Sequence, residues 1–176
     1  MYGFSKFIPG IAGLSAIIIF IRFLGSETYG QYSLILAQCN LLVALCFGWL
    51  NQSQLRYLEM DKHHDQFPFS LIASFIVSSI AGAIILILLF WSGHATYNKI
   101  IVSLMCIGSI ASFTLIKTLY QSNINPRQVI WITSVQSILA ILLPLSIIFT
   151  YDKTSIAMLF GISLSFLLVS SWVIIQ

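Results

Sequence analysis

A small set of cationic and amide side chains interrupts a chain that is otherwise almost entirely apolar. Gln31 and Gln38 stand seven residues apart, which is about two turns of an α-helix, so both fall on one helical face. Arg22, Arg56 and Lys117 lie at or near the ends of apolar runs. Such groups are costly in lipid unless they are paired or hydrated. Two interpretations follow: hydrogen bonds between helices with snorkelling basic side chains, or the wall of a wet cavity that binds an anionic ligand.

Further polar side chains within the apolar runs fit either interpretation. An amide or hydroxyl inside a membrane helix can bond to a neighbouring helix or line a hydrated path. The additional candidates are Asn40, Asn51, Gln52, Thr133, Gln136 and Ser137.

Residues that could support catalysis or metal binding are sparse. The charged segment 58–66 contains His63 and His64 among acidic residues, but adjacent histidines do not share a helical face and the spacing matches no known metal site. We expect this segment to be a solvated loop. The sequence has no nucleophile elbow, no phosphate-cradling glycine loop and no carboxylate within an apolar run. It therefore favours a protein that is not an enzyme and needs no metal or cofactor.

The composition indicates an integral membrane protein. Of 176 residues, 59% are hydrophobic and 7% are charged, and the mean hydropathy is +0.97, whereas soluble domains carry about 25% charged residues. The net charge of +3 comes without a basic patch, so nucleic acid is not an expected partner. Cys39, Cys46 and Cys106 lie inside apolar runs and are expected to be free thiols in the packed or lipid-facing part of the protein.

The charged residues divide the chain into runs that are long enough to cross a bilayer. A helix needs about 20 residues to span about 30 Å of hydrocarbon, and only helices or closed barrels satisfy the backbone there. Because the runs do not alternate as barrel strands do, the predicted fold is all-α. One transmembrane domain covers 1–176, with antiparallel helices at about 5–25, 30–52, 68–92, 99–121, 128–150 and 154–176.

Small residues at four-residue spacing predict where helices pack closely. The third predicted span carries Ser70, Ser74, Ser78 and Gly82, and shorter stripes occur in the first and last spans. Such stripes let helix backbones approach each other in lipid, where the hydrophobic effect does not draw helices together. Pro144 is expected to kink the fifth span, because proline removes a backbone hydrogen bond.

The distribution of basic residues predicts the orientation. Cytoplasmic loops of membrane proteins carry an excess of lysine and arginine. Five basic residues fall on one side of the predicted bundle and three on the other, which places the N-terminus in the cytoplasm. The larger group is Lys6, Arg56, Lys62, Lys117 and Arg127, and the smaller group is Arg22, Lys99 and Lys153.

The stretch IRFLGSETYGQYS, residues 21–33, resembles the N-terminal signature of polysaccharide flippases. These are the O-antigen (Wzx-like) transporters of the multidrug/oligosaccharidyl-lipid/polysaccharide exporter superfamily. The resemblance continues upstream through SKFIPGIAGL and downstream where the second span runs into GWLNQSQLRY. It covers about residues 5–60, and beyond them only the spacing of the spans agrees.

The resemblance implies a bundle of six transmembrane helices that forms one lobe of a two-lobed flippase, with a central cavity between the lobes. The implied substrate is a lipid-linked oligosaccharide on an undecaprenyl diphosphate carrier, such as an O-antigen, lipopolysaccharide or capsule repeat unit, flipped across the bacterial inner membrane by alternating access. Arg22 would be a cavity cation for the diphosphate, with Arg56 and Lys117 as weaker candidates and Gln31 and Gln38 on the cavity wall.

Six spans correspond to one lobe, so we expect the chain to be the N-terminal half of a longer transporter, completed by a second lobe or by a homodimer partner. Two alternatives remain open at this stage. One is a small multidrug-type exporter that works as a homodimer, and the other is a membrane scaffold that transports nothing. A membrane enzyme of lipid-linked sugar metabolism is disfavoured, because it would show acidic and histidine clusters.

Overall fold

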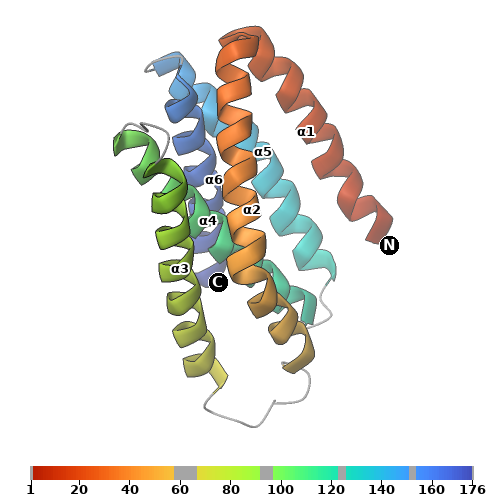
Figure 1. The fold of residues 1–176 in the computed structure, drawn as a ribbon. Coiled ribbons are helices and arrows are strands. Elements are labelled where there is room, and N and C mark those ends of the chain that lie inside the picture. Colours follow the sequence, from red (N-terminus) through yellow and green to blue (C-terminus); the bar gives the residue numbers. More distant parts are fainter. Residues whose placement is uncertain (1, 58–66, 92–96, 123–125, 151–153, 176) are drawn as a thin grey trace.

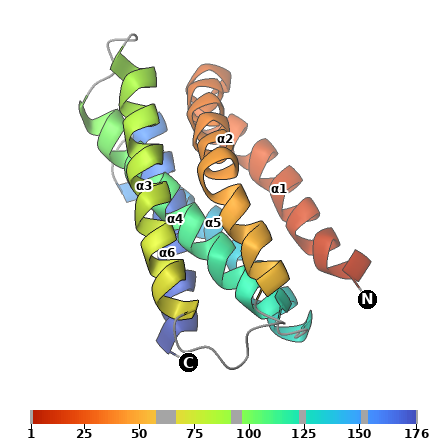
Figure 2. The same ribbon diagram turned by 60° about the horizontal axis from the view of Figure 1, so that its bottom comes forward.

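The computed structural model is a bundle of helices that run alternately up and down (Figures 1 and 2). It describes residues 2–57, 67–91, 97–122, 126–150 and 154–175. All secondary structure in these ranges is helical, and the predicted all-α fold is confirmed to that extent. The six helices are α1 (Tyr2–Leu24), α2 (Ser26–Tyr57), α3 (Phe67–Trp91), α4 (Tyr97–Ser122), α5 (Pro126–Thr150) and α6 (Ser155–Ile175).

Five of these helices, α2 to α6, are long and apolar enough to cross a membrane. The helix α1 has 23 residues, and its segment Gly10–Leu24 is also apolar. At about 1.5 Å per residue, α1 as a whole is about 35 Å long, compared with roughly 30 Å of hydrocarbon. The chain thus has the make-up of a multi-pass, all-α membrane protein.

The tight connection between α1 and α2 depends on Gly25. Its φ is +85°, in the left-handed region that side chains with a Cβ disfavour. The Gly25 amide still donates to the Ile21 carbonyl at 3.0 Å, and the Gly25 carbonyl accepts from the Tyr29 amide at 3.2 Å. The backbone therefore turns from one helix into the next within one residue, with polar groups at the turn satisfied.

The centre of the bundle is formed by α4 and α6. The most extensive helix contacts are those of α6 with α4 and α5, followed by those of α2 with α4. The helices α1 and α3 lie at opposite sides of α2 (Figures 1 and 2). The helix α1 packs mainly against α5, and α3 packs against α2 and α4. The N-terminal half of α1 leans away from α2 in both views. One side of α2 is consequently left uncovered between α1 and α3.

The close helix packing predicted from small residues is confirmed in α3 and α6, but not at Gly13 of α1, where a Cβ would meet nothing within 4 Å. Ser78 of α3 is 3% exposed. One turn further, a Cβ placed on Gly82 would lie 3.7 Å from Cys46 Sγ, an ordinary contact. At Gly161 of α6 the approach is much closer, since a Cβ there would lie 2.6 Å from the Pro144 Cα atom. The helix α5 is unbroken at Pro144, and Gly161 leaves the space that this backbone contact requires.

Large apolar side chains cover the outside of the bundle, as expected for a protein solvated by lipid. On α3, residues Ile72, Ile76, Val77 and Ile80 are all more than half exposed. The buried hydroxyls within the helices mostly bond to the preceding turn of their own helix, for example Ser109 to Cys106 at 2.9 Å. Such bonds offset the free-energy cost of burying a hydroxyl group, and they need no partner on a neighbouring helix.

Candidate functional site

Exposed polar side chains occur along the uncovered side of α2, interrupted by the exposed apolar residues Leu41 and Leu45. Gln31 and Gln38 are both exposed, and Gln52 and Arg56 are exposed further along the same helix. Arg56 follows Gln38 by 18 residues, about five complete turns, so the two share one helical direction. Glu27, also exposed, stands close to the same line at the opposite end. We call Glu27, Gln31, Gln38, Gln52 and Arg56 the α2 polar stripe.

The depth of Gln38 is the unusual feature of the stripe. At about 1.5 Å per residue, the 32 residues of α2 cover about 48 Å and extend beyond both faces of a 30 Å hydrocarbon layer. If α2 is centred in that layer, Gln31 and Gln52 reach the headgroup boundaries. Gln38 then lies only about 5 Å from the midplane. An exposed amide at that depth is unfavourable against lipid tails and favourable against water or another polar surface.

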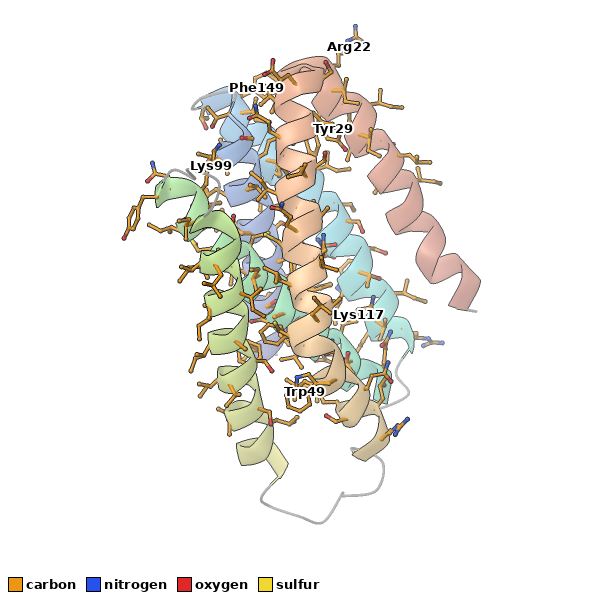
Figure 3. The ribbon with its side chains drawn as sticks, viewed as in Figure 1. Arg22, Tyr29, Trp49, Lys99, Lys117 and Phe149 are labelled. Atoms are coloured by element: carbon orange, nitrogen blue, oxygen red, sulfur yellow. The ribbon has the colours of Figure 1, made fainter. Side chains whose placement is uncertain are left out.

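Arg22 does not join this stripe. It is a basic residue in the last turn of α1, where its charge complements the partial negative charge of the helix C-terminus. Its side chain is exposed and points away from the end of the bundle (Figure 3). Among the described residues it forms no ion pair. Arg22 is therefore available to an anion at this surface but lines no pocket in the present arrangement.

The predicted cations lie toward opposite ends of the molecule. Figure 3 shows Arg22 beyond one end of α2 and Lys117, from α4, toward the other. Arg56 is exposed near the Lys117 end, and Lys117 itself is half-buried and has an interaction partner. Of the five residues predicted from the sequence, the structure brings Gln31, Gln38 and Arg56 onto one surface and leaves Arg22 and Lys117 apart from it.

Two amides near the Lys117 end have buried side-chain oxygens, and only one of them, Asn51, is among the polar candidates named from the sequence. Gln54 is 2% exposed, and among the described residues its Oε1 atom accepts no hydrogen bond. Asn51, one turn earlier on α2, also has a buried and unpaired side-chain oxygen. Their types alone could not reveal them, because Gln52 lies between them and is exposed. Only the packing of α2 against its neighbours separates these amides.

The structure also contains an open cavity of about 310 Å³ between α1 and α5, to which α2 and α6 contribute lining residues. Its polar wall consists of Tyr29, Tyr32, Gln136 and Ser137. From the sequence, the two tyrosines are identified only as part of the flippase-like stretch. Gln136 and Ser137 are named there only as polar candidates, without a binding partner. Nothing in their spacing predicts that residues more than a hundred positions apart meet.

Neither a metal site nor a disulfide occurs within the described residues. No group of three histidine, cysteine or acidic side chains comes together there, and the histidine-containing segment 58–66 lies outside the described residues. Cys39, Cys46 and Cys106 are buried free thiols, as predicted. Cys39 Sγ lies 3.8 Å from the Ser103 carbonyl oxygen of α4, so these thiols serve helix packing.

The chain matches no protein-family model, no curated protein and no solved structure. Its function must therefore be argued from its own residues and from the flippase-like stretch at 21–33.

Proposed function

We propose that this chain is one six-helix lobe of a polysaccharide-type flippase that exports lipid-linked oligosaccharides across the bacterial inner membrane. The observation that carries the proposal is the α2 polar stripe, with Gln38 exposed near the centre of a helix long enough to span. A hydrated surface at mid-membrane depth is what a transporter of a polar head group needs, and a lipid-facing helix avoids it.

The arginines at the two ends of the bundle suit an anionic lipid carrier, whereas the stripe itself ends at Glu27 on the Arg22 side. A diphosphate is doubly acidic, and guanidinium groups bind phosphate oxygens with two parallel hydrogen bonds. Arg22 is exposed at one end of the bundle and Arg56 at the other. In this account each binds the diphosphate at its own membrane face. The amides between them hydrogen-bond the sugars during passage.

The uncovered side of α2 also implies a partner. A lobe that rocks against another lobe would enclose the stripe in a cavity open to one membrane face at a time. We propose a second six-helix unit as that partner, either another lobe or a second copy of this chain. With the N-terminus in the cytoplasm, the Arg56 end faces the cytoplasm and the Arg22 end faces outward.

Deletion of the coding sequence in the organism that carries it tests the proposal. The expected result is loss of surface polysaccharide together with accumulation of undecaprenyl-diphosphate-linked repeat units in whole-cell lipid extracts. Re-expression of the intact gene should reverse both changes, and a Gln38→Leu variant at equal membrane level should reverse neither fully. Unchanged surface glycan and an unchanged lipid-linked pool in the deletion strain would refute the proposal.

A further inference from the structure

The cavity between α1 and α5 has a mixed wall. Small and apolar side chains of α1, including Ala12, Gly13 and Ala16, form one side. Gln136 and Ser137 of α5 form part of the other side. The rings of Phe20 and Tyr32 meet edge to face with centroids 6.5 Å apart, and the Tyr29 ring lies 5.7 Å from that of Tyr32. Figure 3 shows Tyr29 on α2 beside α1. The lining thus combines aromatic rings with polar groups.

The polar groups of this cavity have unused hydrogen-bonding capacity. Tyr32 is 4% exposed, and within the described part of the chain its hydroxyl has no hydrogen-bond partner. The same holds for the side-chain amide of Gln136. Neither the Tyr32 hydroxyl nor the Gln136 amide is a sealed, unpaired atom, so both are accessible from the cavity. Each can therefore form a hydrogen bond to a molecule that enters it.

The backbone of α5 adds two more positions for hydrogen bonds. Ser137 donates to the Thr133 carbonyl at 2.7 Å, so its oxygen keeps free lone pairs for a donor. Pro144 has no N–H group and cannot bond to the carbonyl four residues earlier, which belongs to Ala140. Ala140 lines the cavity. Pro144 thus leaves the Ala140 carbonyl without its usual helical donor, on the helix that carries Gln136 and Ser137.

The lining contains no charged side chain. Phosphate or another anion is disfavoured in such a site, because the cavity offers it no compensating charge away from water. An uncharged molecule with several hydroxyls satisfies both the donors and the acceptors. The volume of about 310 Å³ is at the small end for ligand sites and equals that of about ten water molecules. One sugar ring fits this space.

We infer that the α1–α5 cavity is a binding site for a single uncharged sugar ring, held by Tyr32, Gln136 and Ser137. The origin of the sugar, a glycosyl unit of the lipid-linked substrate, rests on the proposed function, whereas the binding itself follows from the cavity. The site is separate from the α2 polar stripe, since Gln31 and Gln38 do not line it. It would recognise the glycan and leave the diphosphate to the arginines.

Photolabelling of the purified full chain in lipid nanodiscs tests this site. The first probe is an alkyl glucoside with a diazirine on its glucose. The two control probes are an alkyl phosphate and a plain alkyl alcohol of the same chain length, each with the diazirine next to the head group. Labelled peptides are mapped by mass spectrometry. The glucoside is expected to label peptides containing residues 12–20 and 136–141 at least fivefold more than either other probe. Equal labelling by all three probes would show that only lipid enters the cavity.

Two variants sharpen the test. Gln136→Leu removes an amide from the wall, and Gly13→Val narrows the cavity at a position where a Cβ meets nothing within 4 Å. Each should lower glucoside labelling at least fivefold, while Ile76→Ala, at an exposed position on α3, should leave it unchanged. Labelling that survives both cavity variants would overturn the assignment. Because the labelling needs no transport, the binding site and the flippase proposal can fail independently of each other.

Discussion

The contact between Gly161 and Pro144 makes the cost of a single methyl group predictable. In Gly161→Ala the new Cβ would lie 2.6 Å from the Pro144 Cα atom, 2.9 Å from the Pro144 nitrogen and 3.2 Å from Ile147 Cδ1. Carbon atoms pack optimally at about 3.5–4.0 Å, so α5 and α6 must separate by about 1 Å. The two nearest atoms belong to the backbone and cannot rotate aside.

The net effect can be worked out from two opposing terms. Overpacking a well-packed interior costs about 1–3 kcal/mol, and the rigid backbone contact places this site at the upper end. Alanine gains about 1 kcal/mol over glycine in a helix. We expect Gly161→Ala to lower the free energy of unfolding by about 2 kcal/mol, which corresponds to a roughly 30-fold change in the unfolding equilibrium.

The buried cysteines supply the assay. Cys39 and Cys106 are fully buried, so a fluorogenic maleimide reacts with them only when the bundle opens, and the reaction reports unfolding on heating in detergent. Gly108→Ala is the matched control, since a Cβ at Gly108 meets nothing within 4 Å. It should unfold at or above the wild-type temperature. A Gly161→Ala protein as stable as the Gly108→Ala protein would refute the close approach of α5 and α6.

Three other predictions concern the turn, a buried amide and the arginine. Gly25→Ala should lower stability by about 1–2 kcal/mol through the left-handed φ alone, and Gly25→Asn by less; equal losses in the same thermal assay would contradict this. Gln54→Leu should leave stability unchanged or raise it by about 1 kcal/mol, because the substitution removes an unpaired buried oxygen. A clear loss of stability would mean that the amide is paired. Arg22→Ala should reduce export of lipid-linked glycan in cells while Arg22→Lys retains part of it, and normal surface glycan for Arg22→Ala at equal protein level would exclude the role.

The helices could be predicted from the sequence because lipid leaves the backbone few alternatives. The span expected at 68–92 is observed at Phe67–Trp91, since an apolar run of this length must bond within itself. The second helix was underestimated at both ends. The observed helix, Ser26–Tyr57, also includes polar residues at both ends, such as Glu27 and Arg56. A helix can continue beyond the hydrocarbon layer, because each added residue contributes one more backbone hydrogen bond.

The candidate site was only partly predictable. Helical spacing correctly places Gln31 and Gln38 on one face, but it cannot say whether that face is covered. Gln52 and Gln54 illustrate the limit, since they are two residues apart and the first is exposed while the second is buried. The α1–α5 cavity was inaccessible for a similar reason. It requires Tyr32 of α2 and Gln136 of α5 to line one cavity, which depends on how the helices pack.

The central claim is that the α2 polar stripe faces water at mid-membrane depth, and thiol labelling in native membranes tests it most directly. A Gln38→Cys variant is treated with a small, charged methanethiosulfonate reagent, which reacts only with thiols that water reaches. The unmodified chain, whose cysteines are buried, gives the background. Ile76→Cys, at a 52% exposed position on α3, reports a lipid-facing site of similar depth. The account predicts rapid labelling at residue 38 and background labelling at residue 76. Background labelling at both positions would contradict it, because Gln38 would then face lipid or a dry helix contact.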